Sequence, residues 1–375
     1  MKVSFKQKAA AEAYVKQLII PSEPMKPVWN TESVMFGKPP KWNYIDGCMI
    51  RAVTMLSEAW DSRELAEYAA RFTDSYVTGS GDIPTLCFSD YNLDNVCGGR
   101  VLIWLWRKTS GERYLRAAER IYREQLCRQP RTSSGNFWHK GIYPGQVWLD
   151  GAYMALPFMA EYAEMNGDEA AAEDVVAQLI NISRTMRDSE TGLYYHGCDE
   201  NRNMPWASPD TGLSGEFWLR SIGWLSAGLA DVCEILPDRA ELKEMLRELL
   251  EALAGCMTGD GMLLQLPASK ELSDNYPETS GTLLFAYSAM KAARLGAAGD
   301  TIRDAGIKAF NAVTEGYITF DGELPVLRNI CLVAGLGGEP RRDGSAEYYL
   351  SEPVVENDAK GIAPYLMAYT ELMKA

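Results

Sequence analysis

The sequence predicts an all-α fold, the (α/α)6 barrel, in which six helical hairpins form a ring; residues 1–375 make a single domain. Three observations predict it. A polar anchor followed by apolar and small residues at helical spacing recurs six times along the chain. Amphipathic stretches alternate with these segments, and the connections are short after each apolar segment and long before it.

The six recurring segments are apolar on all sides, so we expect them to be inner helices that other helices surround. Their anchors, in chain order, are Asp46, Asp94, Asp150, Arg220, Ser280 and Lys360. The amphipathic stretches keep one charged face and are expected to be the outer helices. They span about residues 4–20, 62–77, 112–128, 168–187, 238–254 and 300–316.

The long connections run from each outer helix to the next inner helix, so they gather at the end of the barrel where the inner helices begin. We call this the active end, because long ordered loops commonly carry function. The connections are 21–42, 78–90, 129–147, 188–215, 255–277 and 317–357. Short apolar runs at 193–196 and 262–265 lie between glycine turn signals and predict short strands there.

Composition limits the partners and the compartment. The net charge of −14 disfavours nucleic acid and anionic membranes, and no apolar run approaches the roughly 18 residues of a membrane span. The eight cysteines include no CxxC pair, and the chain has only two histidines. We therefore predict free thiols in the cytoplasm and neither a metal site nor a cofactor.

Three aspartates stand at or just inside predicted inner-helix starts: Asp46, Asp94 and Asp150. Helix capping explains any one of them equally well. Three at one rim favour a carboxylate-lined cleft with aromatic walls, which is typical of a sugar site. The aromatic neighbours are Trp42, Tyr44, Tyr91, Trp148 and Trp224.

The positive charge at the active end comes from few side chains. Arg220 lies among apolar neighbours and needs an anionic partner, either an aspartate of the same rim or a substrate carboxylate. His139 and His196 lie in the long loops, where each is as readily a structural residue as a site residue. Arg220, His139 and Lys140, with the N-terminal ends of the inner helices, could attract an acidic substrate.

The blocks GNFWHKGIYPGQVWLDGAYMALPF (135–158), TGLYYHGCDE (191–200) and FWLRSIGW (217–224) resemble the unsaturated rhamnogalacturonyl hydrolases of glycoside hydrolase family 105. These enzymes are relatives of the unsaturated glucuronyl hydrolases of family 88. The resemblance implies an (α/α)6 barrel that removes a 4,5-unsaturated uronic acid from the non-reducing end of lyase-generated oligosaccharides. Galacturonyl-rhamnose from rhamnogalacturonan, a pectin, is the substrate expected first.

The resemblance also implies roles by motif position. Asp150 in WLDG matches the proton donor, and Asp94 in YNLD matches the second carboxylate. The expected substrate-binding residues are Trp148, His196, Arg220, Trp224, His139, Lys140, Tyr44 and Met154. The chain departs from the family pattern at Cys198, Ser221 and Ile222, which we expect to affect the preference for the neighbouring sugar.

The substrate's double bond dictates the expected reaction, because a vinyl ether is hydrolysed by adding water across C4=C5. Asp150 is expected to protonate C4 and then, as a carboxylate, to activate the water that attacks C5. This requires Asp150 to carry its proton near neutral pH. Two alternatives remain: an inverting glycosidase acting on saturated sugars with Asp94 as base, and a uronate-binding protein without turnover.

Overall fold

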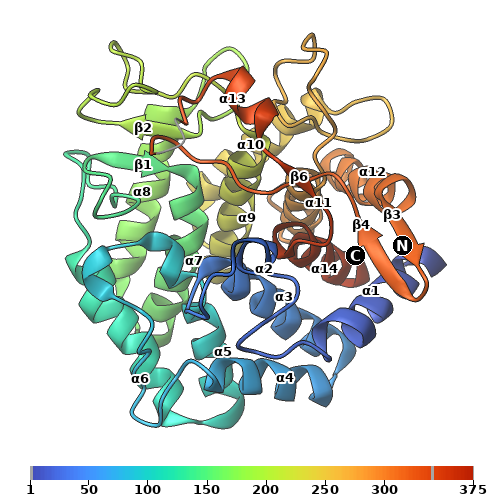
Figure 1. Cartoon of the computed structure of the whole chain (residues 1–375). Coiled ribbons are helices and arrows are strands. Elements are labelled where there is room, and N and C mark those ends of the chain that lie inside the picture. The colour runs from blue at the N-terminus through green and yellow to red at the C-terminus, as the bar shows by residue number, and fades with distance from the viewer. Residues whose placement is uncertain (1–2, 339–341, 375) are drawn as a thin grey trace.

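The protein is an (α/α)6 barrel, seen here in a computed structural model that describes residues 3–338 and 342–374 (Figure 1). Within these residues six inner helices form a closed ring in which each contacts the next and the last contacts the first. They are α3 (Tyr44–Trp60), α5 (Gly99–Thr109), α7 (Leu149–Asn166), α9 (Leu219–Ile235), α11 (Thr279–Arg294) and α14 (Ala359–Lys374). The predicted fold class is confirmed.

The outer helices alternate with the inner ones along the chain, as predicted. They are α1 (Phe5–Tyr14), α4 (Arg63–Asp74), α6 (Glu112–Arg120), α8 (Glu169–Met186), α10 (Ala240–Cys256) and α12 (Asp300–Tyr317). Helix α1 packs against α12 and α14, so the two ends of the chain meet and complete the sixth hairpin (Figure 1). No helix in the described ranges is long and apolar enough to cross a bilayer.

The second inner helix begins later than predicted. The segment around Asp94 forms a 3-10 turn, Leu93–Val96, and the α-helix α5 starts only at Gly99. A Cβ atom on Gly98 would lie 2.4 Å from the Trp42 ring, and one on Gly99 would lie 2.6 Å from the Phe158 ring. The two glycines permit this close packing and also weaken the helix at its start, so Asp94 lies on a turn before the helix.

The prediction of strands at 193–196 and 262–265 is wrong. Tyr194 and Leu264 each make one isolated bridge, to Arg187 and Pro277, because neither run has a longer partner segment alongside it. The described residues instead contain three antiparallel pairs of short strands. These are β1 (Gln146–Trp148) with β2 (Gly197–Asp199), β3 (Ile318–Asp321) with β4 (Leu324–Leu327), and β5 (Ile330–Cys331) with β6 (Val354–Val355).

A buried charge cluster ties the inner helices together, three turns along from the active end. Asp231 of α9 accepts hydrogen bonds from Arg100 of α5 and from Lys291 of α11, the latter at 2.7 Å. Arg100 also pairs with Glu161 of α7 at 2.7 Å. Burial alone would raise the pKa of Asp231, but Lys291 and Arg100 hold it far below its usual value. Removing one member of such a buried pair typically costs about 3–5 kcal/mol.

Candidate active site

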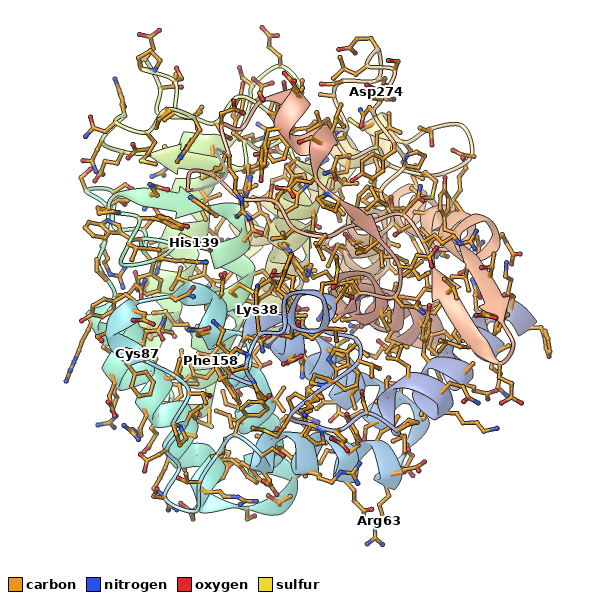
Figure 2. All side chains as sticks on the ribbon, in the orientation of Figure 1. Lys38, Arg63, Cys87, His139, Phe158 and Asp274 are labelled. Carbon is orange, nitrogen blue, oxygen red and sulfur yellow. The ribbon has the colours of Figure 1, made fainter. Side chains whose placement is uncertain are left out.

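A cavity of about 500 Å³ opens at the active end of the barrel. The starts of α3 and α7 form its base, and the loop before β1 forms one side. Two parts of the chain from its opposite ends complete it: the region of α2 (Thr31–Phe36) and residues within 332–334 and 342–353. Figure 2 labels His139 and Lys38, two lining residues about a hundred positions apart in sequence that lie on the same part of the molecule.

Of the ten predicted site residues, all within the described ranges, seven line this cavity: Tyr44, Asp94, His139, Lys140, Trp148, Asp150 and Met154. Asp150 lies in the first turn of α7, whose N-cap is Trp148, and its side chain makes no capping bond. Strand β2 pairs with β1 and continues from His196, whose carbonyl accepts the Leu149 N–H at 3.1 Å. The strand pair therefore brings His196 to the start of α7.

His196 lies behind Asp150 instead of lining the cavity. Its ring is fully buried, and Nε2 lies 3.2 Å from Asp150 Oδ2. Within the described residues neither atom makes a hydrogen bond, whereas His196 Nδ1 lies 2.7 Å from the Tyr349 hydroxyl. Asp150 therefore has the cavity on one side and a buried imidazole on the other.

The second carboxylate, Asp94, is paired. Its Oδ2 lies 2.7 Å from Lys140 Nζ, and its Oδ1 lies 3.6 Å from His139 Nε2. Burial alone would raise the pKa of Asp94, but Lys140 and His139 outweigh it and hold the pKa below its usual value. Burial lowers the pKa of His139 to about 4. At neutral pH the site therefore holds a charged Asp94–Lys140 pair and a neutral His139.

Stacked rings form one wall of the cavity. The His139 and Trp148 rings are 4.5 Å apart and 17° from parallel, and Tyr143 stacks on Trp148 at 5.0 Å. Trp148 directly precedes the helix that carries Asp150. An aromatic face beside a carboxylate suits a sugar ring, which has an apolar face and polar edges.

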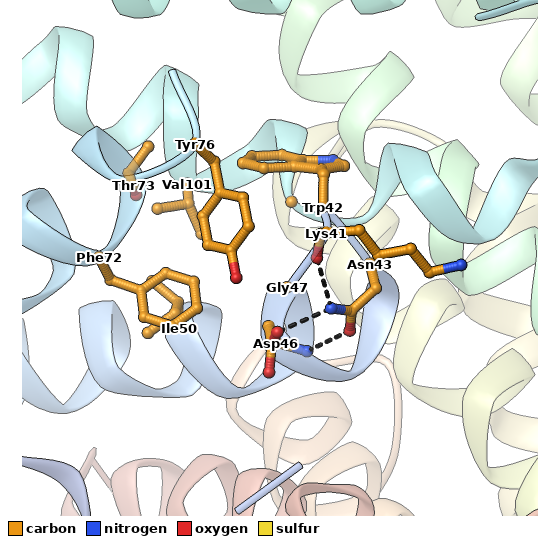
Figure 3. Close-up of a pocket in the computed structure, with 11 residues that line it drawn as sticks. Lys41, Trp42, Asn43, Asp46, Gly47, Ile50, Phe72, Thr73, Tyr76 and Val101 are labelled. Carbon is orange, nitrogen blue, oxygen red and sulfur yellow. Dashed lines mark hydrogen bonds between the residues drawn. The ribbon is translucent and has the colours of Figure 1, made fainter. Parts of the chain in front are cut away.

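Asp46 does not join the predicted cleft. Its carboxylate accepts hydrogen bonds from Trp29 Nε1 and Asn30 Nδ2, both at 3.1 Å, and from Asn43 Nδ2 at 2.7 Å. It borders a separate cavity of about 20 Å³ between α3 and α4 (Figure 3). Burial raises the pKa of Asp46 to about 6, although these hydrogen bonds oppose the rise. Asp46 is therefore not the N-cap of α3 that the capping alternative expects: Asn43 is the N-cap, and its Oδ1 accepts the Asp46 N–H at 3.0 Å.

Arg220 and Trp224 also lie outside the cavity. The buried Arg220 guanidinium donates to the backbone carbonyls of Cys331 and Leu332, and not to an aspartate of the rim. It fixes the chain at the point where residues 332–334 begin to line the cavity. Trp224 is buried against Tyr153, with ring centres 4.6 Å apart. A direct sugar contact does not fit the position of either side chain.

Residues 22–375 match Glycosyl Hydrolase Family 88. The chain belongs to this family. Its fold matches the family 105 glycoside hydrolase of C. acetobutylicum ATCC 824 with a TM-score of 0.90, at 31% identity over 98% of this chain and 99% of that chain. This family 88 protein is therefore a glycoside hydrolase.

Two sequence relatives add to this. The 24.9 kDa protein in picA locus of Rhizobium radiobacter is 41% identical over 228 residues, which are 58% of this chain and 97% of that protein. The unsaturated rhamnogalacturonyl hydrolase YesR of Bacillus subtilis (strain 168) is 24% identical over 266 residues, 68% of this chain and 72% of that protein.

Sequence reasoning missed several side chains that line the cavity of this family 88 enzyme. They are Glu32, Phe36, Lys38, Tyr143, Arg342 and Glu352. Their only signal was membership of the long loops expected at the active end, with Tyr143 in the YP pair of the motif block. Throughout the described residues, no group of three or more His, Cys, Asp or Glu side chains is arranged to hold a metal ion.

Proposed function

We propose that this family 88 enzyme releases a 4,5-unsaturated uronic acid from the non-reducing end of oligosaccharides made by polysaccharide lyases. The most specific form of the proposal is unsaturated galacturonyl-rhamnose from rhamnogalacturonan, in pectin degradation. The similarity to YesR supports that form. The observation that carries the proposal is the position of Asp150, between the cavity and the buried His196.

The proposed reaction adds water across the C4=C5 double bond. The Asp150 carboxyl donates its proton to C4, leaving an oxocarbenium-like centre at C5. Water attacks C5 and gives a proton back to the Asp150 carboxylate. The product at C5 is a hemiketal, which opens and releases the neighbouring sugar. One water molecule is consumed and Asp150 returns to its starting state, so a single acid–base residue suffices.

The state of Asp94 favours this reaction over inversion at a saturated sugar. An inverting enzyme needs a second carboxylate that is free to deprotonate water. Asp94 is instead paired with Lys140 at 2.7 Å, and its pKa is lowered, which weakens it as a base. A charged Asp94 is suited to accepting hydrogen bonds from sugar hydroxyls. We therefore assign it to substrate binding.

The test compares wild type with Asp150→Asn on unsaturated and saturated disaccharides, following the loss of the conjugated-alkene absorbance. We expect wild type to consume only the unsaturated sugar. The variant should lose at least about 10²–10⁴-fold in kcat, the usual contribution of general acid–base catalysis. Asp300→Asn, on an aspartate that is 82% exposed in an outer helix, is the matched control.

Circular dichroism should show that both variants are folded. Turnover of the saturated sugar by wild type would support the inverting alternative instead. A wild-type rate in Asp150→Asn would remove Asp150 from the role of acid.

We also propose that the enzyme acts in the cytoplasm on imported oligosaccharides. The eight cysteines all lie in the described ranges and are free thiols. Two of them, Cys48 and Cys97, have sulfur atoms only 3.5 Å apart without a disulfide. Free thiols this close are typical of a reducing compartment. Fractionation of cells followed by immunodetection tests this proposal, and finding the protein in the medium would contradict it.

A further inference from the structure

The substrate of the proposed function carries a carboxylate on C5, so the cavity needs a cation to bind it. In the described part of the chain, three cationic side chains line the cavity: Lys38, Lys140 and Arg342. Lys140 is already paired with Asp94 at 2.7 Å, and Lys38 with Glu32 at 3.0 Å. For Arg342 there is no ion pair with any carboxylate of the described residues.

The position of Arg342 depends on a glycine. A Cβ atom on Gly335 would lie 2.8 Å from Arg342 Nη1 and 3.5 Å from Cζ3 of the Trp148 ring. The absence of a side chain at 335 therefore lets the guanidinium lie close to the indole that precedes Asp150. A larger residue there would displace the arginine.

Hydrogen bonds hold the described residues on both sides of the Arg342 guanidinium. The Gly337 N–H donates to the Arg342 carbonyl at 2.8 Å. The Gly335 N–H donates to the Tyr348 hydroxyl at 3.0 Å. Arg220 fixes the start of the same segment by donating to the Cys331 and Leu332 carbonyls. The guanidinium is thus presented to the cavity from an anchored backbone.

We propose that Arg342 binds the C5 carboxylate of the unsaturated uronic acid and makes the enzyme specific for the charged sugar. This inference rests on the proposed function. A guanidinium fork can form two parallel hydrogen bonds with a carboxylate, which fixes the plane of that group. The carboxylate is conjugated with C4=C5, so fixing its plane also orients the alkene toward Asp150. Lys38 and Lys140 would each have to leave an existing ion pair to do the same.

The experiment measures kcat/KM for the unsaturated disaccharide and for its C5 methyl ester, which has the same alkene without the charge. In wild type the acid should react faster than the ester. In Arg342→Gln we expect kcat/KM for the acid to fall about 10- to 100-fold, the usual cost of losing hydrogen bonds to a charged group. The value for the ester should change less than about 3-fold, because the ester has no charge for the arginine to bind.

Gly335→Ala provides an independent variant that keeps the arginine but displaces it. Because the atom it meets is the far end of a flexible side chain, we expect a selective loss for the acid that is smaller than in Arg342→Gln. Arg63→Gln is the charge control, because Arg63 is 91% exposed on α4 and pairs only with Glu67 among the described residues (Figure 2). It should leave the ratio of acid to ester rates unchanged.

The outcomes separate the inference from the function it rests on. If wild type turns over neither substrate, the proposed function fails, and the inference fails with it. If wild type is active but Arg342→Gln affects acid and ester equally, the function stands and Arg342 does not bind the carboxylate. An unchanged preference for the acid in both Arg342→Gln and Gly335→Ala would overturn the inference in the same way.

Discussion

The hydrogen bond between Tyr349 and His196 Nδ1 holds the imidazole with its Nε2 toward Asp150. Burial raises the pKa of the Tyr349 phenol well above its usual value, so the hydroxyl stays protonated and can donate to His196 Nδ1 at 2.7 Å. When the hydroxyl donates, the imidazole proton lies on Nε2, 3.2 Å from Asp150 Oδ2; in the other tautomer Nδ1 donates to the hydroxyl instead. Tyr349 does not line the cavity, so it acts as a positioning residue.

Replacing Tyr349 by phenylalanine removes this hydrogen bond but keeps the ring. We expect kcat to fall about 10-fold, equivalent to about 1.4 kcal/mol, with KM changed less than 2-fold. Steady-state kinetics on the unsaturated disaccharide measure both. Tyr122→Phe is the control, because Tyr122 is a half-buried tyrosine that stacks on Tyr162 away from the cavity. A change in KM alone would show that Tyr349 affects substrate binding instead of His196.

The sequence predicted single residues well where a motif starts a helix and less well along the helices. Asp150 and Trp148 line the cavity because they stand at the start of α7. Arg220 and Trp224 belong to α9, which is apolar on nearly all sides, and such a pattern does not show which face turns toward the cavity. Hydrophobic periodicity therefore could not reveal that both side chains point elsewhere.

Among the elements, α2 is the one whose position depends on charge. None of its six residues, all of them described, is buried, and Val34 is 64% exposed, so apolar packing contributes little. Its Glu32 lies 3.1 Å from Lys360 at the start of α14 and 3.0 Å from Lys38. Burial would raise the pKa of Glu32, but Lys360 and Lys38 outweigh it and lower the pKa. The ion pairs tie α2 to the rim of the cavity.

Glu32→Gln tests this tether. We expect KM to rise about 5-fold with kcat nearly unchanged, because α2 supplies part of the cavity wall but no reacting group; 5-fold corresponds to about 1 kcal/mol. Limited proteolysis should cut the segment 31–38 faster in the variant. Glu64→Gln, at an exposed first-turn glutamate of α4, is the control. If both KM and the cleavage rate stay at wild-type values, apolar contacts and not charge fix α2.

The helical hairpins were predictable because each combines a strong 3.6-residue pattern with a short connection. Helix α2 was not, since six residues with no buried face show no such pattern. The later start of α5 was also missed, because the close approach of Gly98 to Trp42 is a tertiary contact. The sequence therefore predicts the repeated helical hairpins, whereas tertiary contacts determine α2 and the start of α5.

For the whole molecule, the alternation of inner and outer helices was sufficient to predict a closed ring. The cavity was only partly predictable, because its lining residues within 31–38, 332–334 and 342–353 come from opposite ends of the chain and meet only when the ring closes. Arg342 and Phe36 have no local pattern that marks them as neighbours. Closure therefore completes the site as well as the fold.

The closed barrel buries His139 and Asp46, whose protonation in acid changes the stability of the fold in opposite directions. Burial lowers the pKa of His139 from 6.5 to about 4, so between these values the unfolded chain binds a proton that the folded protein does not. Stability therefore falls as the pH drops through this window. Burial raises the pKa of Asp46 from 3.8 to about 6, so below pH 6 the folded protein binds its proton first. That contribution increases stability as the pH drops.

The two contributions are each about 2–3 kcal/mol between pH 7.5 and 4.5 and should nearly cancel in wild type. Compared with wild type, His139→Gln should gain about that much free energy of unfolding on acidification, and Asp46→Asn should lose about that much. Urea unfolding of all three proteins at both pH values measures this. Each substitution removes only one of the two opposing titrations. Parallel pH dependence of stability in the three proteins would therefore show that folding shifts the pKa of neither His139 nor Asp46.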